Sequence, residues 1–254
     1  MYAYIVGNPT VDLIITNLGV AKRVGGPPYY MGMALAALGI RPIALGVVGS
    51  EEAELVSREL SKIGVEPRLK IGDATAYFEL DYRQRPRRAK ALRRPTTKID
   101  GVVEGPLVLI APVYDEVGRL EFAADLSAVD LQGFIRAGLE APNADVAHFS
   151  DDDMAVELGE LPRLNKKWRI VLYTRGIGGA YMAYDGVIYY ADSARINAED
   201  VTGSGDVFLA VFATIMLRRG DPEAALCEAS SYTAGFLARG RVERLEYGCV
   251  ARKI

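Results

Sequence analysis

Residues 200–219, DVTGSGDVFLAVFATIMLRR, decide the fold class of this 254-residue chain. The segment predicts a helix that is apolar all round, and such a helix belongs in the core of a protein. Gly203, Ser204 and Gly205 stand where the helix begins, so backbone N–H groups can point outward at its positive end and form an anion site. Asp206 follows, well placed to take a proton beside a bound anion. The alternative is that Asp206 only stabilises the first helical turn.

Outside this segment, short apolar strands alternate with helices. Buried strands are predicted at 3–8 and 41–49, and further strands at 106–112, 120–126, 144–150 and 168–174, with a hairpin at 181–191. Helices are predicted at 27–39, 50–64 with Ser50 as N-cap, 130–139, 151–158, 204–219 and 221–240. Strands that alternate with helices imply an α/β fold in which a mostly parallel sheet is covered on both faces.

The composition excludes several classes of protein. Half of the residues are hydrophobic, which is ample for a core and argues against disorder. A formal charge of −3, from 30 basic and 33 acidic residues, gives no reason to expect nucleic-acid binding. The longest apolar run, 207–217, is half of the ~20 residues that span a bilayer. Cys227 and Cys249 are too few for a disulfide scaffold or a zinc cluster. We therefore expect a cytoplasmic protein without a membrane or nucleic-acid partner.

Residues 75–82 do not fit the parallel sheet, because apolar and polar side chains alternate there as in a half-exposed strand. The stretch 83–98 then holds eight basic residues and no acid. We interpret residues 75–100 as a small lid on a single domain, 1–254. The basic run is interpreted as the solvated surface of that lid, although one of its arginines could clamp a transferred phosphate.

Two nucleotide-binding motifs and a catalytic triad can be excluded. The chain contains no Gly-Lys pair and hence no Walker A loop. The third glycine of a dinucleotide fingerprint is replaced by Phe208. The only histidine, His148, lies between Ala147 and Phe149 on a predicted buried strand, where a packed side chain is expected rather than a catalytic one.

The chain resembles the ribokinase-like (phosphofructokinase-B type) carbohydrate kinases from end to end. DVTGSGDVFLAVF (200–212) is similar to their C-terminal signature D-T-x-G-A-G-D-x-F, with Ser204 in place of alanine. RVGGPPYYMGMALAALG (23–39) matches their glycine pair and the helix that follows, and TRGIGGA (174–180) matches their T-x-G-x-x-G segment. The resemblance implies a three-layer α/β/α sandwich with a mostly parallel central sheet and a small β lid.

The resemblance also implies a reaction, the transfer of the γ-phosphate of ATP, with Mg²⁺, to a hydroxyl of a small sugar or cyclitol. Asp206 takes the position of the general base, and the backbone at Gly203, Ser204 and Gly205 that of the anion hole. Matching positions assign the acceptor to Asp12, Gly25 and Gly26, and the nucleotide to Thr174, Gly176 and Gly179. Lid strands often pair between subunits in this family, which makes a homodimer through the lid an expectation.

Two departures from the family pattern bear on specificity. Tyr30 stands where an asparagine usually holds the substrate, so it either packs against a ring of the acceptor or belongs to the core. Ser150 and Asp153 take the Asn and Glu positions of the N-x-x-E motif. Asp153 then either reaches the metal through water or simply begins a helix.

The form GGPxYY together with DLQGFIR (130–136) looks most like an archaeal branch that includes myo-inositol kinases. This likeness adds Gln132 and Arg136 as acceptor contacts. A nucleoside kinase is the close alternative, because Tyr30 can stack on a base. A non-catalytic sugar or nucleotide sensor on the same fold is disfavoured by the presence of Asp206.

Overall fold

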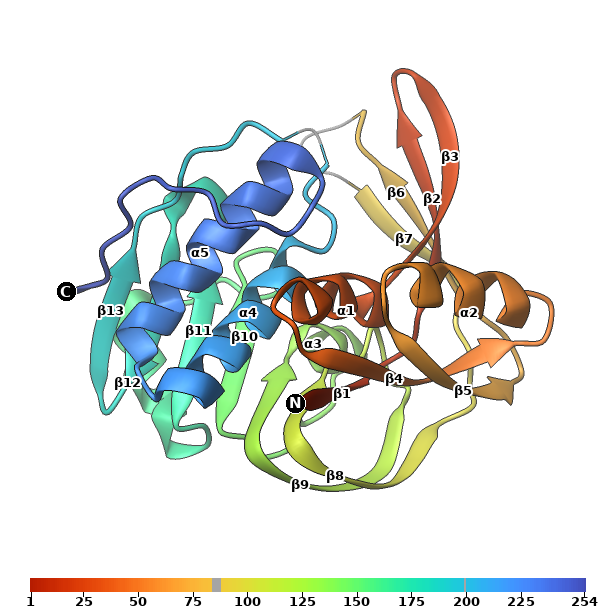
Figure 1. Ribbon diagram of the computed structural model, residues 1–254, viewed down its shortest axis with the longest axis horizontal. Coiled ribbons are helices and arrows are strands. Elements are labelled where there is room, and N and C mark those ends of the chain that lie inside the picture. The colour runs from red at the N-terminus through yellow and green to blue at the C-terminus, as the bar shows by residue number, and fades with distance from the viewer. Residues whose placement is uncertain (84–87, 199) are drawn as a thin grey trace.

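The computed structural model describes residues 1–83, 88–198 and 200–254, which form two β-sheets and the helices around them (Figure 1). The large sheet has ten strands in the order β14-β13-β12-β11-β10-β9-β8-β1-β4-β5, and the small sheet has four in the order β3-β2-β6-β7. Neighbouring strands from β5 to β11 run parallel, whereas β12, β13 and β14 are added antiparallel. The predicted α/β class with a mostly parallel sheet is confirmed.

The strands of the large sheet are β1 (Tyr2–Val6), β4 (Arg41–Gly49), β5 (Glu66–Gly72), β8 (Ile99–Ile110), β9 (Val117–Asp130), β10 (Val146–Ser150), β11 (Ile170–Thr174), β12 (Ala180–Tyr184), β13 (Val187–Ala191) and β14 (Arg252–Lys253). The small sheet consists of β2 (Thr10–Thr16), β3 (Gly19–Gly25), β6 (Ala76–Asp81) and β7 (Arg88–Arg93). The helices are α1 (Pro27–Ala37), α2 (Ala53–Lys62), α3 (Gln132–Ala137), α4 (Ser204–Arg219) and α5 (Pro222–Arg239), with 3₁₀ segments at Leu158–Lys166 and Gly176–Gly178.

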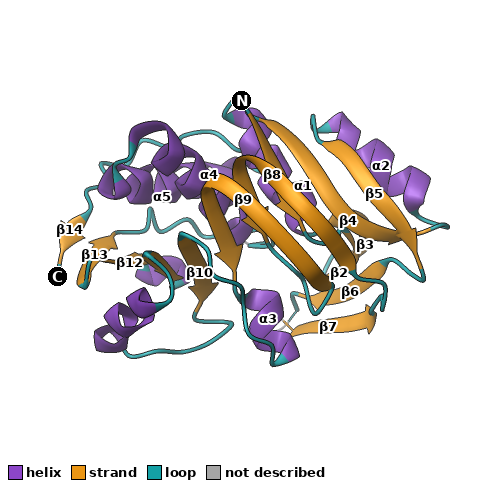
Figure 2. Ribbon diagram, turned by 90° about the horizontal axis from the view of Figure 1, so that it is seen from below, coloured by secondary structure: helices purple, strands orange, loops and turns teal. Residues whose placement is uncertain are grey.

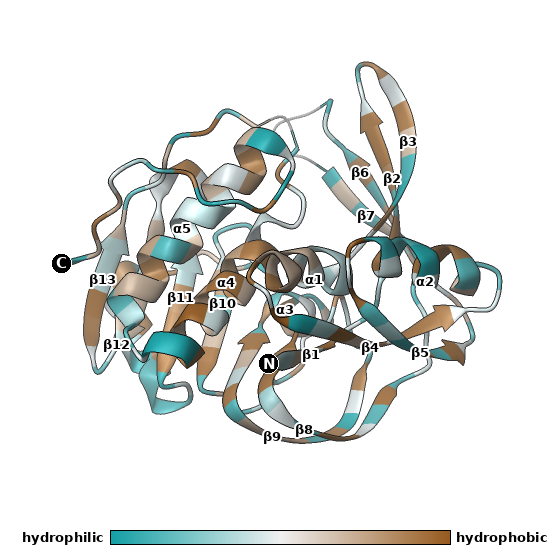
Figure 3. Cartoon of the chain, viewed as in Figure 1, coloured by the Kyte–Doolittle hydropathy of each residue, from teal (hydrophilic) through white to brown (hydrophobic). Residues whose placement is uncertain are grey.

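Helices cover both faces of the large sheet. Figure 2 shows α1, α4 and α5 on one side, and α3 with the 3₁₀ segment Leu158–Lys166 on the other. Every residue of α4 from Val207 to Met216 is buried, as the sequence predicts, and Figure 3 shows this helix in the hydrophobic colour. Asp221 caps α5 by accepting a hydrogen bond from the N–H of Ala224 at 3.0 Å. No helix in the described part of the chain is long and apolar enough to cross a membrane.

The predicted helix at 151–158 is wrong. Ser150 donates from its backbone N–H and from its hydroxyl to one carboxylate oxygen of Asp153, at 3.0 and 2.7 Å. Such a local turn competes with helix formation. The chain runs on without regular structure to position 157, and the 3₁₀ segment follows.

The predicted N-cap at Ser50 is also wrong. Glu52 is the N-cap residue of α2, and its side chain makes no cap hydrogen bond. It accepts from the hydroxyls of Thr75 and Tyr77 instead, both at 2.7 Å, and thereby ties α2 to β6 and the residue before it.

The small sheet is larger than the predicted strand pattern at 75–82. Its strands β2 and β3 come from residues 10–25, for which the sequence analysis predicts no strands. Residues 84–87 of the basic run lie outside the described residues. The structure also joins Cys227 and Cys249 by a disulfide that the sequence analysis does not predict.

Candidate active site

The beginning of α4 has the geometry of an anion site. Gly203 is the N-cap residue and has a left-handed φ of 80°, which glycine adopts without strain. The first N–H groups of a helix have no acceptor within the helix. The N–H of Ser204 donates to the carbonyl of Val201 at 3.2 Å and is engaged in this turn. The N–H groups of Gly205 and Asp206 are therefore the better placed donors for a bound anion.

Asp206 lies in the first turn of α4, where a fixed pattern of charges surrounds it. Burial, followed by the charge of Asp130, raises the pKa of its carboxyl group well above the ordinary value. The charges of Asp12 and Asp153 also raise this pKa, whereas Arg136 lowers it. A raised pKa makes a carboxylate a better proton acceptor, as a general base for a hydroxyl requires.

Asp12 lies at the root of the small sheet, against the glycine pair. The residue is only 4% exposed. A Cβ atom on Gly25 would lie 2.3 Å from Asp12 Oδ2, so the carboxylate rests directly on the backbone of that glycine. Gly26 has a φ of 81° and is the N-cap of α1. Gly25 thus leaves room for the carboxylate, and Gly26 makes the sharp entry into the helix.

Thr10 belongs to the same corner of the molecule. Its hydroxyl is buried and has no hydrogen-bond partner within the described residues. A Cβ on Gly25 would lie 3.2 Å from this hydroxyl and 2.3 Å from the Asp12 carboxylate, so both groups flank one glycine. A buried hydroxyl without a partner is costly, so a water molecule or a ligand group is needed to complete its hydrogen bonding. The sequence analysis does not identify Thr10.

Asn8 and Glu116 hold the loop that leads into this corner. The buried carboxylate of Glu116 accepts from the backbone N–H groups of Asn8, Val113 and Tyr114 at 3.0, 2.8 and 2.9 Å. Burial raises the pKa of Glu116. Since these bonds join the loops after β1 and β8, they fix the ends of two neighbouring parallel strands.

Tyr30 packs directly on the anion site. A Cβ on Gly203 would lie 2.1 Å from the Tyr30 ring, so this ring needs a glycine there. The ring also makes edge contacts with Tyr29 and Phe236 at centroid distances of 5.3 and 6.1 Å. Burial and the charge of Asp12 raise the pKa of the Tyr30 phenol. Tyr30 therefore belongs to the core, which is one of the two alternatives that the sequence leaves open, and its packing against a ring of the acceptor stays a prediction.

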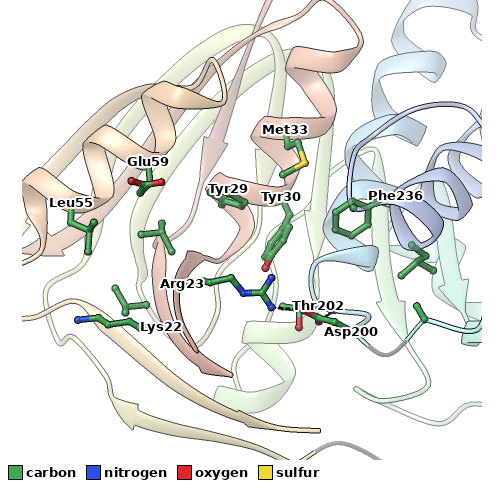
Figure 4. A pocket seen from close by; sticks show the side chains of 15 residues that line it. Lys22, Arg23, Tyr29, Tyr30, Met33, Leu55, Glu59, Asp200, Thr202 and Phe236 are labelled. Carbon is green, nitrogen blue, oxygen red and sulfur yellow. Dashed lines mark hydrogen bonds and ion pairs between the residues drawn. The ribbon is translucent and has the colours of Figure 1, made fainter. Parts of the chain in front are cut away.

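A cavity of about 700 Å³ lies beside Tyr30 (Figure 4). Its walls come from β3, α1, α2, α5 and the loop before α4. Tyr29, Phe236 and Leu237 line it on the apolar side, and Arg23 and Asp200 on the polar side. Asp12 and Asp206 are not among its lining residues, so the cavity adjoins the predicted catalytic residues without containing them.

His148 connects the ends of three parallel strands. Its Nδ1 lies 2.8 Å from Asp130 Oδ2, and its Nε2 lies 3.2 Å from Thr174 Oγ1. The ring also lies against Gly205, whose Cβ would be 3.2 Å from His148 Cε1. The prediction of a packed, satisfied histidine is confirmed. Its partner Asp130, which the sequence analysis does not single out, supplies the largest charge effect on Asp206.

Arg136 on α3 lies between two other predicted site residues, Gln132 on the same helix and Asp153. Arg136 donates to the Gln132 side chain at 2.7 Å, and the same nitrogen lies 3.9 Å from Asp153 Oδ1. The described residues contain no group of three or more His, Cys, Asp or Glu side chains that could hold a metal ion. An Mg²⁺ at this site would therefore take most of its ligands from phosphate and water, with Asp153 as the nearest predicted contact.

The predicted nucleotide residues form a tight turn after β11. The N–H of Arg175 donates to the carbonyl of Gly179 at 2.9 Å, and the N–H of Gly179 donates to the carbonyl of Gly176 at 3.2 Å. Both glycines have positive φ, 47° and 88°. Thr174 ends β11 and is held by His148. The turn stands at the same edge of the sheet as the beginning of α4, because the His148 ring bonds to Thr174 and also lies against Gly205.

No protein-family model matches the chain. A 2-dehydro-3-deoxygluconokinase of Thermoproteus tenax is 32% identical over 106 residues, which are 38% of this chain and 33% of that relative. The match thus spans about a third of the relative's length.

Solved structures are similar over nearly the whole chain. A pyrophosphate-dependent kinase of the ribokinase family, complexed with a pyrophosphate analogue and myo-inositol, has a TM-score of 0.74 at 19% identity, with 96% of this chain and 97% of that one covered. Ribokinase of Arabidopsis thaliana, complexed with ribose and ATP, has a TM-score of 0.72 at 16% identity, over 95% and 94%. Aminoimidazole riboside kinase of Salmonella enterica has a TM-score of 0.70 at 15% identity, over 95% of both chains. The chain has the ribokinase fold.

Proposed function

We propose that this protein is a ribokinase-family kinase that transfers a phosphoryl group to a hydroxyl of a small sugar or cyclitol. One observation carries the proposal. Asp206, with its raised pKa, stands beside the exposed N–H groups at the start of α4, and the charge of Asp12 is close enough to act on it. A base, an anion site and an acceptor-binding carboxylate are the parts that phosphoryl transfer to an alcohol needs.

The acceptor lies over Gly25 and Gly26. Asp12 accepts hydrogen bonds from acceptor hydroxyls, and Thr10 completes the set with its buried side chain. The carboxylate and the hydroxyl of this corner suit a polyhydroxylated ring. As the acceptor oxygen attacks phosphorus, its proton passes to Asp206, the new O–P bond forms and the bond from phosphorus to the donor's bridging oxygen breaks.

The developing charge on the transferred group is met by the backbone N–H groups of Gly205 and Asp206, with Gly203 giving the turn its shape. Arg136 adds a positive charge near the same point. ATP is the proposed donor, held at the turn that contains Thr174, Gly176 and Gly179. Mg²⁺ bound to the phosphates would neutralise part of their charge, with Asp153 reaching it through water. Pyrophosphate is the alternative donor, since a similar structure is a pyrophosphate-dependent kinase.

A nucleoside kinase is the second candidate, and the cavity beside Tyr30 favours it. Its volume of about 700 Å³ falls in the range of small-molecule sites. Tyr29, Tyr30 and Phe236 offer aromatic faces and edges to a base. An acceptor with a base in this cavity and its sugar over Gly25 would span both regions.

A screen of acceptors tests the proposal. Purified protein is incubated with Mg²⁺ and either ATP or pyrophosphate, over panels of sugars, cyclitols and nucleosides, and the phosphorylated product is detected by mass spectrometry. The proposal predicts a product in the sugar or cyclitol panel that is lost in Asp206→Asn. A product in the nucleoside panel alone would favour the second candidate. Donor binding without any product would indicate a non-catalytic sensor and contradict the proposal.

A further inference from the structure

The carboxylate of Asp200 joins the small sheet to the segment that leads into α4. Arg23, on β3, donates to Asp200 Oδ2 at 2.5 Å. Tyr82, directly after β6, donates from its hydroxyl to Asp200 Oδ1 at 2.7 Å. The N–H of Thr202 donates to the same oxygen at 2.9 Å, and the hydroxyls of Tyr82 and Thr202 also bond to each other. These four residues are called the Asp200 clamp.

The clamp receives one residue from each of the two segments that build the small sheet. Arg23 comes from residues 10–25, and Tyr82 follows the strand that comes from residues 76–81. The N–H of Tyr82 also donates to the carbonyl of Ile15 on β2 at 2.9 Å, which locks Tyr82 to the first segment. The clamp is therefore a property of the assembled sheet and not of one flexible side chain.

On the other side, the clamp fixes the backbone just before the anion site. The hydrogen bond from the Thr202 N–H to Asp200 closes a turn, and Gly203 with its left-handed φ is the next residue. The direction in which the first N–H groups of α4 point depends on this turn. Hydrogen bonds to a charged group are stronger than those between neutral groups, which suits Asp200 to hold the turn. Burial raises the pKa of Asp200, but the hydrogen bonds that it accepts from Thr202, Tyr82 and Arg23 outweigh this effect, so its pKa is lowered and the group is charged.

The small sheet also carries the acceptor-binding carboxylate. In the antiparallel register of β2 and β3, Asp12 stands opposite Arg23, so the strand pairing fixes the two residues relative to each other. The same pair of strands thus positions Asp12 for the proposed acceptor and Arg23 for its bond to Asp200.

We propose that Asp200 is a positioning residue through which the small sheet holds the anion site in its working shape. The inference rests on the proposed kinase function. When Arg23 and Tyr82 reach Asp200, the turn before Gly203 is fixed and the N–H donors are aimed. When the sheet moves away, the turn loses both contacts.

The test compares Arg23→Gln with Arg68→Gln as the matched control. Arg68 forms a pair with Glu66 on β5 at 2.7 Å, and the exposed fractions of the two pairs are alike, 49% and 38% against 51% and 35%. For Arg23→Gln we expect kcat to fall about tenfold or more, the equivalent of one lost charged hydrogen bond. Asp200→Asn should fall in the same way, and the double variant should lose little more than either single one. Arg68→Gln should keep kcat, and Arg23→Lys should recover part of the loss.

Hydrogen exchange supplies a readout that needs no substrate. Amides 202–206 should exchange faster in Arg23→Gln than in Arg68→Gln, at equal melting temperature. If the wild type phosphorylates no acceptor, the proposed function fails while this comparison still tests the clamp. Equal exchange in the two variants would overturn the proposal. So would a rise in acceptor KM with unchanged kcat, because Arg23 would then serve only to bind the acceptor.

Discussion

Helix α4 and the small sheet meet at the candidate active site, and they are built in opposite ways. In α4, ten consecutive residues from Val207 to Met216 are buried. In β3, the five residues from Gly19 to Arg23 are exposed and only the last two are buried. The first element is held by core packing on all sides, whereas the second is anchored at its root and by the bonds of its side chains.

The proposed base and the proposed acceptor residues lie on different elements of this pair. The proposed base, Asp206, stands on the element that packing holds rigid, and the proposed acceptor residues Thr10 and Asp12 stand on the element that is anchored at one end. Catalytic groups need a precise position, which core packing supplies. A sheet that holds the acceptor must let it enter and leave, which few buried contacts allow. The following variants should separate the two elements by which kinetic constant they change.

Apart from a change of Asp206 itself, the largest effect is expected for Gly203→Ala, at the start of α4. The new Cβ would lie 2.1 Å from the Tyr30 ring and the backbone would remain at a φ of 80°. Because the ring and the turn must shift, kcat should fall ~10²- to 10³-fold, as when an oxyanion-hole donor is lost. Gly220→Ala at the other end of α4 is the control, with a φ of 65° and no atom within 4 Å. Its kcat should stay normal, and equal losses of kcat in both variants would break the argument.

Asp12→Asn should act through the acceptor. The amide keeps the size of the side chain but loses the charge that strengthens hydrogen bonds to acceptor hydroxyls. At ~1.5 to 3 kcal/mol for each charged hydrogen bond, the acceptor KM should rise tenfold or more. The donor KM should hardly change. Steady-state kinetics with both substrates varied give the two constants, and an unchanged acceptor KM would remove Asp12 from the site.

Thr10→Val should raise the acceptor KM less than Asp12→Asn does, and it should not lower the melting temperature. Valine has the shape of threonine without its hydroxyl, which has no partner among the described residues. The acceptor KM should rise by a factor of ~3 to 10, the equivalent of one neutral hydrogen bond. The melting temperature should hold or rise, because an unsatisfied buried polar group is removed. Thr75→Val is the control, since that hydroxyl bonds to Glu52 and to the N–H of Gly49, and its melting temperature should fall. Thermal unfolding and acceptor kinetics on both variants decide.

The same contrast explains what the sequence could predict. Most of the parallel strands and α4 were predicted because they are apolar runs, and the hairpin was predicted from its turn at Asp185-Gly186. The parallel strand β5 was not predicted, because polar and charged side chains interrupt it. The strands β2 and β3 were not predicted either, because an exposed β3 has no apolar pattern and β2 continues the apolar character of β1. The helix expected at 151–158 failed because one hydrogen-bonded turn, Ser150 with Asp153, outweighs a favourable N-terminal pattern.

The site shows a similar division. Asp206, Asp12 and the glycines were predicted because the segments that contain them resemble the signatures of the family, and their roles stay predictions. Thr10, Asp130 and Arg23 act through neighbours that are distant in the sequence. Arg23 and Asp200 are 177 residues apart, and no local pattern relates them. A lone threonine or arginine becomes informative only when its partner, or the lack of one among the described residues, is visible.

The raised pKa of Asp206 should also affect the melting temperature of the protein. Its pKa is raised in the folded protein, so ionised Asp206 costs folding free energy above the ordinary pKa of an aspartate. Asp206→Asn should therefore raise the melting temperature at neutral pH, and the gain should vanish as the pH falls below that ordinary value, where both side chains are neutral. A lower melting temperature at neutral pH would mean that Asp206 mainly stabilises the first helical turn.

The value of kcat for Asp206→Asn, measured on an acceptor that the wild type phosphorylates, tests the central claim most directly. The change removes charge and basicity while it keeps the size of the side chain and the beginning of α4. If Asp206 is the general base, kcat should fall ~10²- to 10⁴-fold, with donor affinity retained. A kcat within about threefold of the wild type, less than 1 kcal/mol in barrier, would contradict the mechanism.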